Sequence, residues 1–255
     1  MFFNLTNSQQ PDVDIVYHYP CCDKYRLPNY NGLSYVAVHD CNSKCFKIET
    51  VRCFKYLGVI LDSKMSWHDH TQSLKCYFRS VVRQFYVISP LCSSSVLKTF
   101  YFGIFHSKLN YGITCWGGSY SNKIKPLLTL QKSVVRKIHH ANNLSHSFEF
   151  FKSSNILPVR HLYYFQVMKR FFSNSNFQRT RTTVYNLRNH NVINVPYFRT
   201  TGYRNSFNVV CRRLFNRLPG HLQSCERKGL FLNQLKKWLL NYNFDEIESL
   251  LRPVA

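Results

Sequence analysis

Acidic side chains are scarce in this sequence. Its 255 residues include 12 aspartates and glutamates against 34 lysines and arginines, which gives a formal net charge of +22. Such a surplus of positive charge repels itself unless a polyanion neutralises it. Nucleic acid is therefore the favoured partner and an anionic membrane the second choice. A basic protein without a fixed partner is the remaining alternative.

A long apolar run is also missing. The most apolar stretch, 96–105, contains Lys98 and is too short to cross a bilayer. The N-terminal residues lack the basic start and apolar core of a secretory signal. The ten cysteines are scattered along the chain, which is typical of free thiols in a reducing compartment. We therefore expect an intracellular protein, nuclear or cytoplasmic, without a membrane partner.

Several catalytic motifs are absent. The sequence has no glycine-rich phosphate loop and no Gly-x-Ser-x-Gly nucleophile motif. It therefore gives no positive case for other enzyme classes, and we expect no small-molecule substrate. Asp12 and Asp14 would share one side of a strand and could bind a divalent ion. A solvated strand start beside Pro11 is the simpler interpretation.

Histidines and cysteines give no clear metal site either. His68, Asp69 and His70 look like a ligand set, but on a helix the two histidines would diverge by about 200°. A polar first turn is the simpler interpretation. Cys41-x3-Cys45 lacks the second ligand pair that a zinc site needs. We therefore expect no metal and no other cofactor in this chain.

The sequence is rich in apolar and aromatic residues, at 45% and 16%, which indicates a packed protein. The predicted fold class is α+β, with a small β-rich N-terminal piece followed by mostly helical regions. The expected strands are Val13–Tyr19, Leu33–Val38, Cys45–Ile48 and Phe54–Leu61.

After Ser66, a favourable N-cap residue, the hydrophobic period becomes helical. The predicted helices are 67–88, 94–111, 123–139, 148–152, 158–172, 205–218 and 230–242. In the second of these, one apolar face comprises Leu97, Phe100, Tyr101, Ile104, Phe105 and Leu109. Pro126 fits only the first turn of the third helix. The polar segment 173–196 is interpreted as an extended surface linker.

Five motifs occur in order between residues 54 and 219. The first comprises Tyr56, Leu57, Gly58, Val59, Asp62, Trp67 and His70. It resembles the segment that joins palm to thumb in the reverse transcriptases of non-LTR (LINE-type) retrotransposons, jockey-like elements in particular. The second comprises His106, Tyr111, Gly112, Trp116 and Gly117, and the third Leu130, Gln131, Lys132 and Arg136. The fourth is 156–159. The fifth is 214–219, which includes Asn216 and Pro219, with Phe215 where the family has tryptophan.

The resemblance implies an RNA-directed DNA polymerase. Its Mg²⁺-binding aspartates lie in a Phe/Tyr-Ala-Asp-Asp turn and on an earlier strand. This sequence has no Asp-Asp dipeptide, and residues 1–3 would correspond to the strand after the catalytic turn. We therefore expect the end of the palm, the thumb and the C-terminal region, inactive as this chain alone. Mg²⁺ is expected only for the full-length polymerase.

Two groups of cationic side chains are candidates for contact with phosphates. The first is Lys125, Lys132, Arg136 and His139, and the second is Arg204, Arg212, Arg213 and Arg217. In the family, the thumb grips the template–primer duplex through its backbone, so the implied partner is RNA or an RNA–DNA duplex. A solvated helix face is the alternative, but few acids balance these cations.

The predicted domains are a palm remnant at 1–65, a helical thumb-like domain at 66–172, the linker at 173–196 and a C-terminal helical region at 197–255. The favoured function is thumb-type nucleic-acid binding by a truncated reverse-transcriptase fragment. The alternatives are a non-enzymatic helical interaction module retained by a host, and a non-functional transposon relic.

Overall fold

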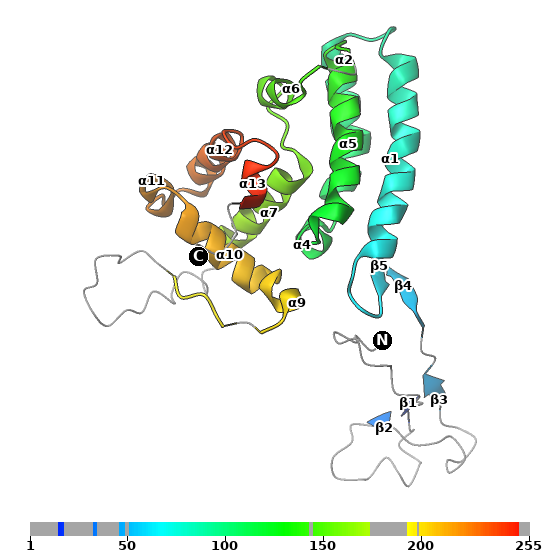
Figure 1. Ribbon diagram of the computed structural model, residues 1–255, viewed down its shortest axis with the longest axis vertical. Coiled ribbons are helices and arrows are strands. Elements are labelled where there is room, and N and C mark those ends of the chain that lie inside the picture. Colours follow the sequence, from blue (N-terminus) through cyan, green and yellow to red (C-terminus); the bar gives the residue numbers. More distant parts are fainter. Residues whose placement is uncertain are drawn as a thin grey trace. The chain divides into compact units, whose positions relative to one another are not determined.

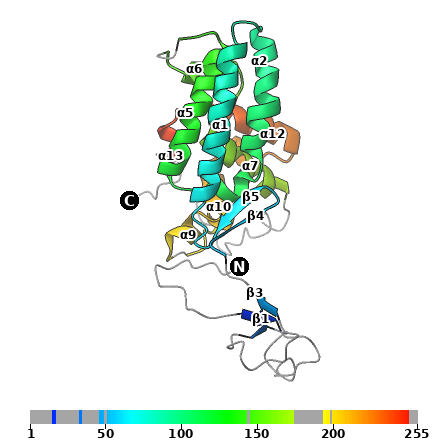
Figure 2. The same cartoon turned by 90° about the vertical axis from the view of Figure 1, so that its right-hand side faces the viewer.

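The computed structural model describes residues 15–17, 33–34, 46–48, 51–142, 145–173, 193–197 and 199–249. The fold is α+β, mostly helical with two small antiparallel sheets in its first part. Contacts divide the chain into two compact units, Met1–Asp69 and His70–Ala255. Helices on both sides of segment 174–192 belong to the second unit, which Figures 1 and 2 show from two sides.

The first unit contains both sheets. Strand β1 (Ile15–Tyr17) pairs antiparallel with β2 (Leu33–Ser34) and with β3 (Phe46–Ile48). Strands β4 (Cys53–Tyr56) and β5 (Val59–Asp62) form a separate hairpin in which Tyr56 faces Val59 across the turn.

The prediction of one continuous strand at Phe54–Leu61 is therefore wrong. Leu57 and Gly58 both have positive φ, at 46° and 82°. Two successive left-handed residues form the two-residue turn whose twist matches that of paired strands. Glycine adopts this conformation at little cost, so Gly58 marks a turn inside an apolar run that reads as a single strand.

The helices that follow are α1 (His68–Ile88), α2 (Ser94–Phe100), η3 (Tyr101–His106), α3 (Ser107–Asn110), α4 (Ile113–Trp116), α5 (Ser121–Ile138), α6 (Phe148–Ser153), α7 (Val159–Ser173), α9 (Thr201–Arg204), α10 (Phe207–Arg217), α11 (Gly220–Gln223), α12 (Lys228–Leu239) and α13 (Glu246–Ser249). No helix in the described ranges is long and apolar enough to cross a membrane.

Helices α2, η3 and α3 follow one another without a break, as predicted for 94–111, but the middle part is a π-helix. Leu97, Tyr101, Phe105 and Leu109, each four residues apart, are all fully buried. In a regular α-helix such a row drifts by about 40° per step. The wider π turn rotates the row back, so all four face the core. Phe100, predicted to belong to this apolar face, is instead 43% exposed.

Helix α5 begins earlier than predicted, at Ser121, so Pro126 lies inside the helix and not in its first turn. Proline has no N–H to donate to the carbonyl four residues before it, which here belongs to Asn122. Because Asn122 is exposed, water can hydrate that carbonyl and the helix continues past the proline.

Helix α7 lies at the centre of the second unit and packs against α4, α5, α10 and α12. Both sides of α7 are buried, including His161, Tyr163, Val167 and Met168. A helix that is buried on more than one side must be covered by several partners. The C-terminal helices α10 and α12 therefore share one core with the helices that precede α7.

Most of the predicted surface linker, residues 174–192, lies outside the described residues. At its C-terminal end Ile193 is 1% exposed, whereas Asn194 is exposed. The Ile193 N–H donates to Asn216 Oδ1 at 2.9 Å, and Asn216 Nδ2 donates to the Ile193 carbonyl at 2.9 Å. A side-chain amide thus pairs with an extended backbone as a neighbouring strand would, which explains one residue of the fifth motif.

Candidate nucleic-acid interface

The first half of the helical unit carries no acidic residue. Between Asp69 and Glu149 the sequence has no aspartate or glutamate but ten lysines and arginines. This interval contains all of α2, η3, α3, α4 and α5, and all of α1 after its first two residues. No carboxylate on these helices can therefore neutralise their cations, and a polyanion can.

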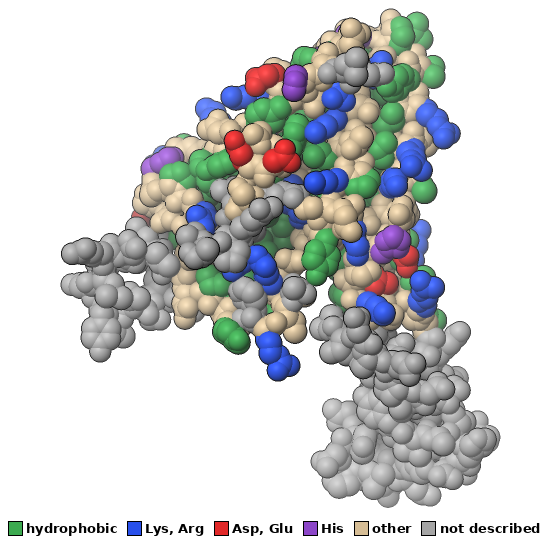
Figure 3. All heavy atoms as spheres, in the orientation of Figure 1, with side chains coloured by type: hydrophobic (Ala, Val, Ile, Leu, Met, Phe, Trp, Pro, Cys, Tyr) green, Lys and Arg blue, Asp and Glu red, His purple; other side chains and the backbone are tan. Residues whose placement is uncertain are grey.

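Helix α1 presents a row of cations that we did not predict. Lys75, Arg79 and Arg83 are spaced by four residues, so they project from one side of the helix. Arg79 and Arg83 are exposed and Lys75 is half-buried. In Figure 3, blue side chains alternate with green ones along α1. The sequence alone contained this signal, because the three cations repeat every four residues, as Leu74 and Phe78 do on the buried side of the same helix.

Helix α5 lies beside α1, as Figures 1 and 2 both show. Lys137 Nζ lies 4.1 Å from the centroid of the Tyr86 ring and so links the two helices. Lys125, one of the predicted phosphate contacts, is exposed on α5. The cations of α1 and α5 thus belong to neighbouring helices of one unit.

Two other predicted cations of α5 contact the protein itself. Lys132 Nζ lies 3.8 Å from the centroid of the Phe244 ring. Burial and then nearby Arg136 lower the pKa of Lys132, which Asp245 partly offsets. Arg136 Nε donates to the Ser145 carbonyl at 2.9 Å.

His139 is similarly engaged. Its Nε2 forms a 2.5 Å hydrogen bond with Ser154 Oγ, and its ring stacks on Phe150 at 4.8 Å. Burial is the main cause that lowers the pKa of His139. Of the four predicted phosphate contacts on α5 and its C-cap, only Lys125 is exposed, because the last two turns, which carry the other three, pack against later parts of the chain.

The second predicted group does come together in space. Burial lowers the pKa of Arg213, and the positive charges of Arg204 and Arg217 lower it further, so the three guanidinium groups are neighbours. Arg217 is exposed. Arg212 Nη1 donates to the Asn194 carbonyl at 3.0 Å. Arg204, Arg213 and Arg217 therefore form a second concentration of positive charge, on α9 and α10.

The residues of the first motif have structural roles. The Asp62 carboxylate accepts backbone N–H groups from Lys64 at 3.2 Å, Ser66 at 2.8 Å and Trp67 at 2.7 Å. Ser66 Oγ accepts the His68 N–H at 3.3 Å, but α1 begins at His68, so Trp67 and not the predicted Ser66 directly precedes the helix. Asp62 thus holds the corner between β5 and α1 through three backbone N–H groups.

The second motif forms a tight turn around a buried tryptophan. Gly112 adopts a left-handed conformation, with φ of 62°. Trp116 is fully buried, and its Nε1 donates to the Tyr111 carbonyl at 3.1 Å. His106, the first residue of this motif, ends the π-helix, and burial is the main cause that lowers its pKa.

An arginine that we did not predict holds the same turn. Arg160 on α7 donates from Nη1 to the Gly117 carbonyl at 2.7 Å and from Nη2 to the Ser119 carbonyl at 2.9 Å. A planar guanidinium suits such a two-pronged contact. Tyr163, one turn later on α7, packs against Gly117 and Gly118. Gly117 of this motif, and Gly118 after it, are therefore required by the close approach of α7.

Gln131 of the third motif is the polar centre of the core. Its side chain is fully buried. Nε2 donates to the Tyr101 hydroxyl at 2.8 Å and to the Leu157 carbonyl at 3.0 Å, while Oε1 accepts the Val159 N–H at 3.0 Å. One side chain thus joins η3, α5 and the fourth motif, and the sequence alone gave no sign of this.

In the fifth motif, Pro219 stands between α10 and α11. Its carbonyl accepts the Leu222 N–H at 2.9 Å and so starts α11. Gln223 Nε2 donates to the carbonyls of Phe215 and Leu218, at 3.0 and 2.9 Å, and so caps the end of α10. These residues set the path of the chain and do not form a catalytic group.

The histidine pair at the start of α1 diverges, as expected. His68 is exposed, whereas His70 is 4% exposed and packs edge-on against Trp116 at 5.7 Å. Burial, and then Lys108, lower the pKa of His70 to about 4. Within the described residues, no three histidine, cysteine or acidic side chains are grouped to hold a metal ion. The aspartates at 12 and 14 and the cysteines at 41 and 45 lie outside those residues.

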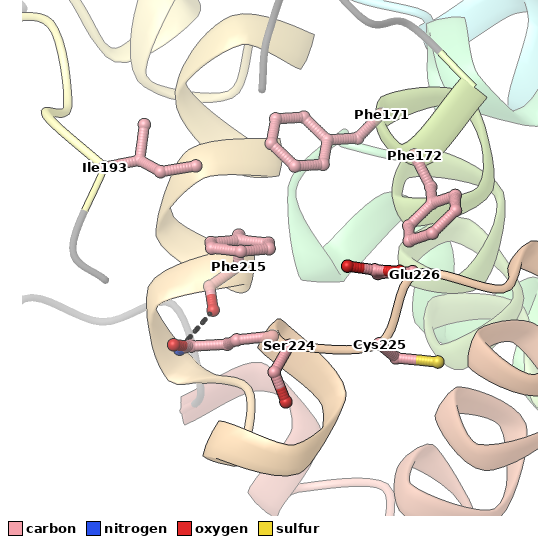
Figure 4. Close-up of a pocket in the computed structure, with 8 residues that line it drawn as sticks. Phe171, Phe172, Ile193, Phe215, Ser224, Cys225 and Glu226 are labelled. Atoms are coloured by element: carbon pink, nitrogen blue, oxygen red, sulfur yellow. Dashed lines mark hydrogen bonds between the residues drawn. The ribbon is translucent and has the colours of Figure 1, made fainter. Parts of the chain in front are cut away.

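A pocket of about 480 Å³ opens in the C-terminal part of the second unit (Figure 4). Its lining comprises Phe171, Phe172, Ile193, Phe215, Gln223, Ser224, Cys225 and Glu226. The only charged side chain in this lining is a carboxylate. Such a surface does not suit phosphate, so the pocket is separate from the candidate interface.

We expect the protein to lose stability in acid because of the buried side chain of His161. It is fully buried, and its Nε2 donates to the Tyr242 carbonyl at 2.9 Å. Burial lowers its pKa to about 4, although this hydrogen bond acts in the opposite direction. Below about pH 6.5 this histidine is protonated in the unfolded chain but stays neutral in the folded protein. The free energy of unfolding should therefore fall between pH 6.5 and 4, by up to about 3 kcal/mol.

Chemical denaturation at a series of pH values measures this loss. In His161→Gln, which retains an amide donor and cannot titrate, the fall over the same interval should be smaller. An equal fall in both proteins would assign the acid sensitivity to other groups, His70 first.

Comparison with known proteins adds no relative: no family model, no curated protein and no solved structure matches this chain.

Proposed function

We propose that the helical unit binds the sugar–phosphate backbone of RNA or of an RNA–DNA duplex, as the thumb of a non-LTR reverse transcriptase does. The observation that carries this proposal is the interval from Asp69 to Glu149, where ten cations and no acid are found. Arg79 and Arg83 on α1 and Lys125 on α5 are the exposed cations we assign to phosphate contact. The group at Arg204, Arg213 and Arg217 adds a second point of attachment.

The chemistry of the interface is electrostatic. Each phosphate neutralised by a lysine or arginine releases condensed counterions, which makes affinity depend steeply on salt and little on sequence. Lys132, Arg136 and His139 contribute less in this proposal, because their side chains already bind other parts of the protein.

In this proposal the chain is a polymerase fragment without its own catalysis. The Mg²⁺-binding aspartates of the family have no counterpart among the residues that resemble it. The motif residues support the proposal in a different way. Asp62, Gly112, Trp116 and Asn216 form corners, turns and backbone pairs, which is what a retained thumb scaffold needs.

Binding to a fluorescent RNA–DNA duplex across a salt series tests the proposal. The logarithm of affinity should fall linearly with the logarithm of salt concentration. Reversing the charge at Arg79 and Arg83 should weaken binding to every sequence and reduce the salt slope by about 2.

The matched control reverses Lys152 on α6 and Lys169 on α7, which are exposed cations outside the acid-free interval. Both double variants change the net charge equally, so a general electrostatic effect would weaken them equally. Equal losses, or no binding by the unaltered chain at low salt, would overturn the proposal.

A further inference from the structure

One exposed surface on the helical unit combines aromatic rings with a cation. Tyr77 on α1 and Phe100 on α2 are 40% and 43% exposed. Lys108 on α3 places its Nζ 5.9 Å from the centroid of the Tyr77 ring. We name this surface, comprising Tyr77, Phe100 and Lys108, the aromatic face.

Lys108 contacts Tyr77, and Phe100 lies about two helical turns before Lys108 on the same run. Phe100, Ile104 and Lys108 are each four residues apart on one continuous helical run, so they project from a common side. The contact between Lys108 and Tyr77 places that side next to α1. The Phe78 and Phe105 rings stack beneath, at 4.0 Å, and fix the two helices against each other.

A single exposed ring is common on a protein surface, whereas exposed rings on neighbouring helices together with a cation form a surface that a partner can cover. The partner must also tolerate positive charge, because the helices that form the aromatic face contain no acid after Asp69. Unpaired bases meet both requirements, since they stack on aromatic rings while their phosphates bind cations. Duplex bases are already stacked on each other and offer little to these rings.

We propose that the aromatic face binds unpaired nucleotides, with Tyr77 and Phe100 stacking on bases and Lys108 contacting a phosphate. The inference rests on the proposed nucleic-acid function and deepens it, because it assigns the duplex backbone and the single strand to different surfaces. Stacking on a base is stronger than the contact of an exposed lysine with a ring. Lys108 can therefore leave Tyr77 for a phosphate without net loss.

The full chain is tested with a duplex, with a 12-nucleotide RNA and with the same strand carrying abasic positions. Unaltered protein should bind the normal strand at least 10-fold more tightly than the abasic one. Tyr77→Ala/Phe100→Ala should lose this preference, since each base–ring stack is worth about 5- to 150-fold in affinity. Its affinity for the duplex and its salt slope should not change.

The control is Tyr120→Ala, which removes a ring that is 55% exposed outside the aromatic face. It should keep the preference for the normal strand, as should Tyr77→Phe, which retains a ring. Circular dichroism shows whether each variant is folded.

The outcomes separate the two proposals. If the unaltered chain binds the duplex but does not distinguish normal from abasic RNA, the inference fails and the proposed function stands. If it binds neither nucleic acid, both fail. If an acidic amphipathic peptide binds with dependence on Tyr77 and Phe100 while single-stranded RNA does not, the face belongs to a protein partner and the inference is overturned.

Discussion

Gly117→Ala is expected to destabilise the helical unit by about 3 kcal/mol or more, which is the upper end for an overpacked core. An added Cβ would lie 2.5 Å from the Ile113 carbonyl oxygen and 2.6 Å from Cδ2 of Tyr163. The first is backbone within the same turn, and the second belongs to a buried ring on α7. Relief of the first contact would distort the end of α4, and relief of the second would separate α4 from α7, where Arg160 also binds this turn.

Urea denaturation followed by circular dichroism measures the loss. Gly229→Ala is the matched control, because a Cβ there would meet nothing within 4 Å. Alanine in a helix is favoured over glycine, so that variant should be unchanged or more stable by up to about 1 kcal/mol. Similar stability of the two variants would show that α7 does not approach Gly117 closely.

Gln131→Leu is expected to cost about 3 to 5 kcal/mol. Leucine has nearly the right size but forms no hydrogen bond, so the Tyr101 hydroxyl, the Leu157 carbonyl and the Val159 N–H would be buried without this partner. Each unsatisfied buried group costs about 1–3 kcal/mol. Gln72→Leu, at an exposed position of α1, should change stability by less than about 0.5 kcal/mol.

A double-mutant cycle makes the Gln131 prediction specific. Tyr101→Phe removes the hydroxyl that accepts from the Gln131 amide. In a Gln131→Leu background this hydroxyl already lacks its partner, so its removal should cost less stability than in the unaltered protein, or even stabilise the fold. Strictly additive effects would contradict a direct hydrogen bond between Gln131 and Tyr101.

The sequence by itself determined the order and type of most helices. The periodic apolar residues of α1, α5, α7 and α10 predicted their positions to within a few residues, because a helix must turn one face to a core. The same local rules placed the start of α7 next to Pro158 and the end of α6 shortly before Asn155, which has a left-handed φ of 56°. Charge composition gave rise to the proposal of a nucleic-acid partner.

Tertiary structure decided what the sequence left undetermined. Leu57 and Gly58 became a turn because two strands pair there, and Phe100 became exposed because the π-helix rotates the row of buried residues away from it. Segments later in the chain cover Lys132, Arg136 and His139. Helical periodicity within α5 could not reveal this burial. Local spacing shows which residues share a face, and only the packing of distant segments decides whether that face meets protein or solvent.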